Sequence, residues 1–141
     1  MLRHFGLAIT IGCAFFVPLS SAAAQHMNEI GNPCEGAGSM LDGSSCWGKE
    51  LEKADEQLNS VYSKIMSVLR SKSNEEQTQK RLRAAQLAWI DYRDKACEAE
   101  ASLYSGGSAK GMSRLACLTS LTDDRIKALR LGFWWQVEKF G

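Results

Sequence analysis

Apolar side chains recur at three- and four-residue steps through most of the chain after residue 46, which is the period of an amphipathic helix. The first of these stripes predicts a helix from about Trp47 to Arg70 and consists of Leu51, Ala54, Leu58, Tyr62, Ile65 and Leu69. The sequence contains no β-rich alternating run of apolar and polar residues, so strands are not expected.

Two more helices follow from the same pattern. Ser73 and Glu76 form a capping box, in which a hydroxyl and a carboxylate satisfy free amide groups at a helix start. The next stripe consists of Leu82, Ala85, Trp89, Ala96 and Leu103. The third stripe consists of Leu115, Leu118, Leu121, Ala128 and Leu129, and the start of its helix stays open because Ser120 and Asp123 also form a capping pattern. These three segments predict an all-α chain folded as a three-helix bundle.

The first 24 residues have the composition of a secretory signal peptide. Arg3 is followed by an apolar run over Phe5–Val17 and by small residues up to Ala24, where we expect cleavage. Lipid attachment at Cys13 is the less favoured alternative, because it would leave a shorter apolar stretch before the cut. Residues 25–45 are rich in Gly, Ser and Asn and predict an extended arm, so that residues 46–141 form the helical domain. The leader predicts a periplasmic or secreted protein without a stable membrane anchor.

Charge and composition limit the classes of partner. The chain has 141 residues and is 45% hydrophobic, which fits one globular domain. Residues 25–141 contain 16 basic and 16 acidic side chains, so a partner would have to be attracted by local patches rather than by net charge. No block of basic residues indicates a nucleic-acid-binding surface.

Four cysteines remain after the leader, which in an exported chain predicts two disulfides. Sequence alone leaves three connectivities. Cys97 lies ten residues before Gly107 and Cys117 ten residues after it, so an antiparallel helix pair turning there would place the two at equal height. This favours a Cys97–Cys117 bridge, with Cys34–Cys46 as the second. The spacing contains no C-x-x-C pair, so no metal site is expected.

Polar residues interrupt the apolar stripes on the sides where the helices should meet. Because a guanidinium cannot lose its proton, a buried arginine needs carboxylate or carbonyl partners, and Asp55 and Glu100 are the candidate carboxylates. The predicted buried polar network consists of Asp55, Tyr62, Gln86, Arg93, Glu100, Thr122 and Arg125. These residues have two possible roles. The structural one is an interior network that fixes helix register, and the functional one is the lining of a ligand cleft.

Two surface features are candidates for partner binding. The small, polar segment that ends the second helix contains Ser105, Gly106, Gly107, Ser108 and Lys110, and it is either an ordinary helix connection or a loop held ready to enter a cleft. The aromatic residues Trp134, Trp135 and Phe140 either cover the end of the bundle or form an exposed patch.

Catalytic chemistry is not indicated. His26 is the one histidine outside the leader and lies in the predicted arm, so a Ser-His-Asp or Cys-His system lacks its base. No phosphate-cradling glycine motif is present, and no pair of carboxylates is singled out for glycoside hydrolysis. We therefore expect neither an enzyme nor a cofactor.

One stretch of the chain has a recognisable motif, Ala85-Gln86-x-x-Trp89-Ile90-x-Tyr92-Arg93-Asp94-x-x-Cys97. Together with Leu58-Asn59-x-x-Tyr62, Gly106-Gly107-Ser108 and Leu121-Thr122-x-x-Arg125, it resembles the LprI-type lysozyme-inhibitor family over about Cys46 to Leu131. This resemblance implies a small exported bacterial protein that binds and inhibits lysozyme. The alternative is an envelope binding or structural protein, such as an immunity or adaptor factor, that does not inhibit lysozyme.

Overall fold

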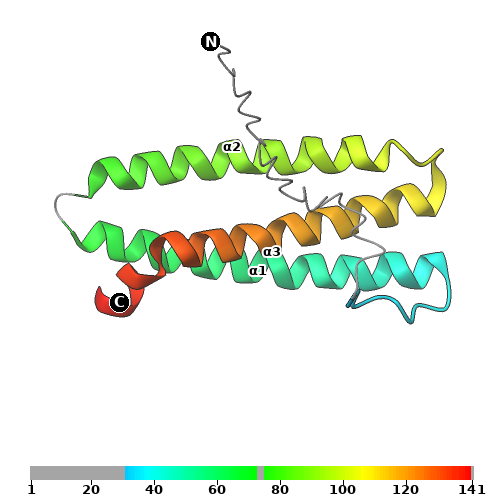
Figure 1. The fold of residues 1–141 in the computed structure, drawn as a ribbon, viewed down its shortest axis with the longest axis horizontal. Helices are drawn as coiled ribbons and strands as arrows, with labels where there is room; N and C mark the ends of the chain where they lie inside the picture. Colours follow the sequence, from blue (N-terminus) through cyan, green and yellow to red (C-terminus); the bar gives the residue numbers. More distant parts are fainter. Residues whose placement is uncertain (1–30, 73–74, 141) are drawn as a thin grey trace, which may run out of the picture.

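Three long helices make up the described part of the protein (Figure 1). The computed structural model describes residues 31–72 and 75–140, so the predicted leader, residues 25–30 of the predicted arm and the capping residue Ser73 lie outside it. The helices are α1 (Met40–Ser71), α2 (Glu76–Ala101) and α3 (Gly107–Phe140). No strand occurs over the described ranges, and the prediction of a disulfide-bonded, all-α three-helix fold is confirmed.

The first helix begins earlier than the sequence predicted. Ser39 is its N-cap residue, and the Ser39 Oγ accepts a hydrogen bond of 3.1 Å from the Asp42 amide. Residues 40–45, predicted as part of the extended arm, are therefore the first turns of α1. The glycine-rich composition misled the prediction. Gly43 is buried in the helix where a Cβ atom would lie 2.6 Å from the Met112 Sδ, so the residue permits close packing of α1 on α3.

The second and third helices also differ from their predicted ends. α2 begins at Glu76 with Glu75 as its N-cap residue and ends at Ala101, which places Leu103 beyond the helix and 83% exposed instead of on the apolar stripe. α3 begins directly after the turn, where Gly106 and Gly107 have φ angles of +118° and +71°. Glycine adopts this conformation without steric cost, which allows the chain to reverse over a few residues.

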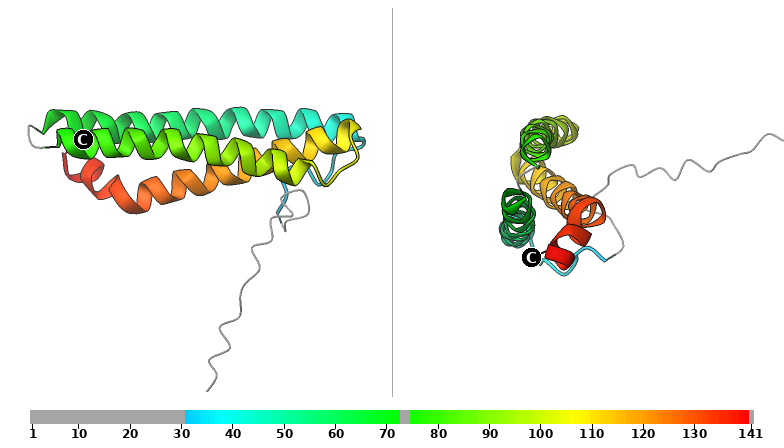
Figure 2. Two further views of the ribbon diagram at one scale, coloured as in Figure 1. Left: turned by 90° about the horizontal axis from the view of Figure 1, so that it is seen from above. Right: turned by 90° about the vertical axis from the view of Figure 1, so that its left-hand side faces the viewer.

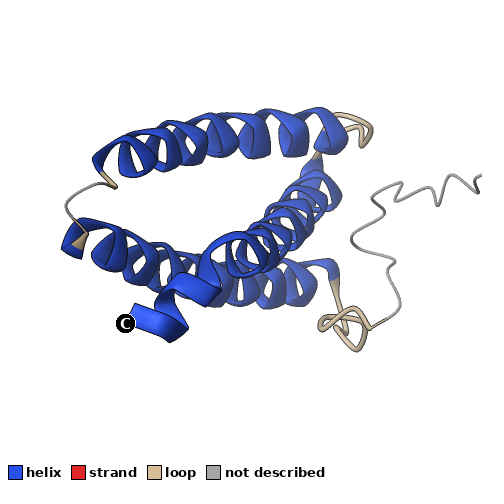
Figure 3. Ribbon diagram, turned by 60° about the vertical axis from the view of Figure 1, so that its left-hand side comes forward, coloured by secondary structure: helices blue, strands red, loops and turns tan. Residues whose placement is uncertain are grey.

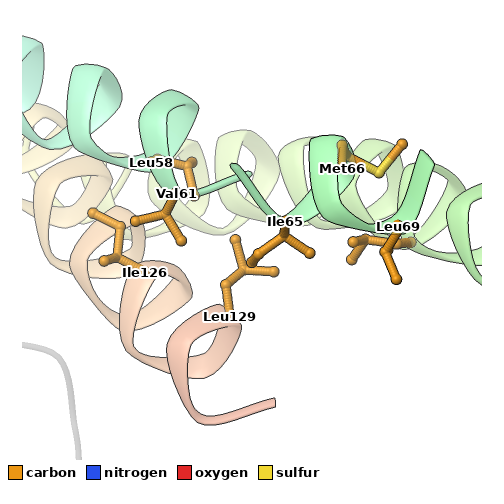
Figure 4. Close-up of a cluster of buried hydrophobic side chains, with 8 residues drawn as sticks. Leu58, Val61, Ile65, Met66, Leu69, Ile126 and Leu129 are labelled. Carbon is orange, nitrogen blue, oxygen red and sulfur yellow. The ribbon is translucent and has the colours of Figure 1, made fainter. Parts of the chain in front are cut away.

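The core lies chiefly between α1 and α3. Leu58, Val61, Ile65 and Leu69 of α1 point toward Ile126 and Leu129 of α3, as Figure 4 shows, and Leu82 adds the contribution of α2. Phe133, Trp134 and Val137 pack against this cluster from the last turns of α3. Trp135 and Phe140 remain 55% and 48% exposed, so only part of the aromatic C-terminus covers the bundle end.

Helix α3 is the element that joins the other two. It runs obliquely along the bundle and packs extensively on α1 and on α2, whereas α1 and α2 touch each other little (Figures 2 and 3). The bridge Cys97–Cys117 ties α2 to α3 and is buried, while Cys34–Cys46 ties the residues before α1 to its second turn. As a result, a groove remains between α1 and α2.

Candidate functional site

A polar cluster crosses the middle of the bundle and is centred on Arg93 of α2. The Arg93 Nη1 atom donates to the Asp55 Oδ1 atom of α1 at 3.0 Å and to the Thr122 Oγ1 atom of α3 at 3.1 Å. Its Nε atom donates to the Asp94 Oδ1 atom at 3.1 Å. One guanidinium thus links all three helices through charge-assisted hydrogen bonds, which are stronger than neutral ones.

A second arginine lies one layer further along the bundle. The Arg125 Nε atom of α3 donates to the Gln86 Oε1 atom of α2 at 3.0 Å. Both guanidinium groups also lie over the ring of Trp89, with centroid distances of 5.2 Å for Arg93 and 5.7 Å for Arg125. Burial lowers the pKa of Arg125 below its ordinary value, but an arginine remains charged at neutral pH.

The predicted network differs from the observed cluster in two respects. Its carboxylates are Asp55 and Asp94, whose side chains are 44% and 47% exposed. The arginine side of the cluster is therefore buried, while its carboxylate side is in contact with solvent. Asp94, next to Arg93 in the chain, is a carboxylate partner that the sequence did not predict, while Glu100 lies two helical turns beyond Arg93 and its place in the network stays a prediction. A helical wheel misses this contact because Asp94 points about 100° away from Arg93.

A groove opens between α1 and α2 beside this cluster. Its volume is about 400 Å³, and Tyr62 and Trp89 are its half-buried aromatic residues. The other lining residues are Asp55, Leu58, Asn59, Arg83, Gln86, Leu87, Ile90 and Arg93. The α1 part of the sequence motif, Leu58, Asn59 and Tyr62, therefore lines one groove together with half of the α2 part, and the lining combines apolar and polar side chains.

The segment Ser105–Lys110 forms the tip of the bundle. Ser105 and Gly106 lie in the turn, while Gly107, Ser108 and Lys110 belong to the first turns of α3, so the predicted loop is shorter than expected. The Lys110 Nζ atom is 2.9 Å from the Glu98 Oε1 atom of α2. This hydrogen bond is the main cause of the lowered pKa of Glu98, and Arg114 adds to the effect. Ion pairs from Glu98 of α2 to Lys110 and Arg114 of α3 thus connect the two helices on either side of the turn.

A smaller hollow lies between α1 and α3 near Pro33. It measures about 330 Å³ and contains Asp123, whose carboxyl pKa is raised above its ordinary value, mainly by partial burial. The neighbouring Asp124 and Glu50 carboxylates raise it further, against the opposing effect of Lys127. A carboxyl with a raised pKa destabilises the folded state when it is ionised at neutral pH.

Replacement of Asp123 by asparagine is therefore expected to raise the thermal midpoint at pH 7. Since the folded-state pKa lies above the unfolded one, this gain should shrink as the pH falls through the raised folded-state pKa, where the wild-type carboxyl takes up its proton, and should be gone below the ordinary aspartate value of 3.8. Thermal unfolding of the wild type and the variant, followed by circular dichroism at pH 7 and pH 3, measures the difference in midpoint at each pH. Asp124→Asn, which removes the ion pair to Lys127, is the charge-matched control and should not raise the midpoint.

Two features are absent from the part of the chain that the structure describes. Among residues 31–72 and 75–140 no helix is both long and apolar enough to cross a membrane. In the same part of the chain, no three His, Cys, Asp or Glu side chains are grouped as metal ligands.

Comparisons with known proteins assign the chain to a family. The model of the family described as lysozyme inhibitor LprI matches residues 32–129, which include all four bridged cysteines, the Arg93 cluster, the groove and the tip. An uncharacterised protein of Rhizobium meliloti (strain 1021), R02472, is 30% identical over 105 residues, covering 69% of this chain and 76% of that protein. No solved structure matches significantly. The chain belongs to the LprI lysozyme-inhibitor family.

Proposed function

We propose that this chain is an exported, non-enzymatic protein that binds lysozyme-type muramidases and inhibits them. The observation that carries the proposal is the family match, which spans nearly the whole described helical domain. Two disulfides and the secretory pattern of Met1–Ala24 support function in an oxidising compartment outside the cytoplasm, either the periplasm or the medium.

The tip between α2 and α3 is the part whose shape best suits a cleft. Retaining lysozymes cleave their substrate with two carboxyl groups that face each other across a cleft. The tip presents small polar residues, Ser105 to Ser108, all of them exposed, together with the exposed Leu103. The Cys97–Cys117 bridge and the Glu98–Lys110 ion pair hold its base. A rigid insert loses less conformational entropy on binding than a flexible one.

The test is the lysis rate of bacterial cell walls by lysozymes of several types, in the presence of the oxidised protein purified after export. We expect the rate to fall at micromolar protein with at least one of them. If no muramidase is inhibited at tens of micromolar, inhibition is rejected. In that case, reproducible recovery of a different envelope protein in complex with this chain would favour the adaptor alternative.

A tip variant identifies the inserted element. Ser105→Trp adds bulk at an exposed position whose φ is negative, so it should fold normally and weaken inhibition at least tenfold. Ser67→Trp, at an exposed position on α1 far from the tip, is the matched control and should inhibit like the wild type. Equal inhibition by both variants would show that the tip does not enter the cleft.

A further inference from the structure

The chain is close to neutral overall, yet its charges are segregated along the bundle. We divide the described residues at the level of the Arg93 cluster. The half with the Cys34–Cys46 bridge and the tip, residues 31–59 and 91–123, is called the arm end. The half with the turn between α1 and α2, residues 60–72, 75–90 and 124–140, is called the hairpin end.

The two ends carry opposite charge. The arm end contains eleven acidic and six basic residues, a formal charge of −5. The hairpin end contains four acidic and ten basic residues, a formal charge of +6. The antiparallel arrangement of α1 and α2 causes this segregation, because it brings the acidic first half of α1 beside the acidic second half of α2 (Figure 1).

The ends act as separate electrostatic surfaces. A helix of 32 residues, the length of α1, extends about 48 Å at 1.5 Å per residue. Exposed charges are screened over roughly 8–10 Å at physiological ionic strength. A partner that approaches the arm end therefore experiences its negative potential and almost none of the compensating positive charge.

On the arm end, acidic side chains lie within two helical turns of one another on both helices that form the groove, and Asp55 is the acidic member of the groove lining. From α1 come Glu52, Asp55 and Glu56, and from α2 come Asp91, Asp94 and Glu98; these six residues are called the acidic face. The two walls converge where Asp55 and Asp94 bind the same guanidinium. Glu52 and Glu56 are exposed, one helical turn apart, and have no ion-pair partner among the described residues.

An apolar patch continues from the acidic face along the groove. Leu87 and Ile90 of α2 line it and are 65% and 37% exposed. Protein interfaces combine an apolar centre with a polar rim, and complementary charge raises the rate at which partners meet. Here the rim is acidic on the arm-end side of the patch, where Asp91 and Asp94 follow Ile90, and basic at Arg83 on the other side. The partner surface that faces the arm-end side is therefore basic.

We infer that the acidic face, with Leu87 and Ile90 beside it, is the docking surface for a strongly cationic protein. The inference rests on the proposed function and specifies it: the partner is a muramidase whose surface near the cleft is basic, and its attraction precedes contact at the tip. A muramidase with an acidic surface is bound much more weakly. The tip lies at the same end of the bundle, so both contacts are available to one partner.

The test measures association rates by biolayer interferometry with a basic lysozyme at 50 and 300 mM salt. The variant Glu52→Lys/Glu56→Lys should associate about tenfold more slowly than the wild type at low salt, and the difference should narrow at high salt. The matched control, Glu76→Lys/Glu138→Lys, makes the same change in net charge with two exposed residues of the hairpin end and should stay within twofold of the wild type. A muramidase with an acidic surface serves as the second partner.

The outcomes separate this inference from the proposed function. Binding that depends on the acidic face but does not slow lysis keeps the docking surface and rejects inhibition. Inhibition with equal effects of the two double variants, or equal affinity for the acidic muramidase, rejects the docking surface and keeps inhibition. Failure to bind any muramidase overturns both.

Discussion

Replacing Cys97 and Cys117 together by alanine is expected to lower the free energy of unfolding by about 3–4 kcal/mol. The bridge closes a loop with a sequence separation of 20, which in the chain-entropy model contributes about 3 kcal/mol. Both half-cystines are also buried against Leu118, so their loss removes packing between α2 and α3. For a domain of this size the thermal midpoint should fall by roughly 10–20 °C.

The second bridge is the control for this prediction. Cys34 and Cys46 close a shorter loop at the edge of the bundle, and Cys46 is partly exposed, so their replacement should cost less while the helices remain intact. Urea unfolding followed by far-ultraviolet circular dichroism gives both values. Equal midpoints for the wild type and the variant without Cys97–Cys117 would contradict the role of this bridge in joining α2 to α3.

Arg93→Ala should be the most destabilising single substitution in the Arg93 cluster and should lower the free energy of unfolding by about 2 kcal/mol. The side chain is 14% exposed and makes hydrogen bonds to all three helices, each worth roughly 1.5–3 kcal/mol when a charged group takes part. The full penalty for stranding buried charges does not apply, because Asp55 and Asp94 are half-exposed and can be rehydrated. The Thr122 hydroxyl also keeps its donor bond to the Leu118 carbonyl.

Two further variants separate charge from packing at this position. Arg93→Met keeps much of the buried stem and should recover part of the lost stability. Arg125→Ala should cost less than Arg93→Ala, since the partner of Arg125 is the neutral amide of Gln86. The free energies of unfolding, measured in urea, give the order of stability of Arg93→Ala, Arg93→Met and Arg125→Ala. A midpoint for Arg93→Ala that equals the wild type would show that the cluster does not stabilise the fold.

Apolar periodicity predicted the three helices because each one must bury a stripe, and Leu58, Ile65 and Leu129 occupy the core as that stripe requires. It did not predict where the helices end. The start of α1 depends on Ser39 and on the packing of Gly43 against Met112, which is a contact over 69 positions in the sequence. Periodicity within one helix contains no information about such contacts.

The candidate site was predictable in its inward residues and not in its outward ones. The positions of Gln86, Arg93, Thr122 and Arg125 follow from helical geometry. The exposure of Asp55 depends on the small contact between α1 and α2, which no single helix reveals. The segregation of charge likewise appears only when the antiparallel order of the helices is known, because the net charge of the chain conceals it.

The positions of the two bridges have a consequence for the chain's covalent topology. One bridge closes within the segment that ends with α1, and the other within the pair formed by α2 and α3, so no bridge among the described residues connects these pieces. A single proteolytic nick between α1 and α2 would leave two independently cross-linked fragments that associate only through non-covalent contacts, chiefly the apolar interface in Figure 4 and the Arg93–Asp55 ion pair. Such fragments, produced separately, would form a natural complementation pair, and reconstitution of the bundle would report directly on the strength of that interface.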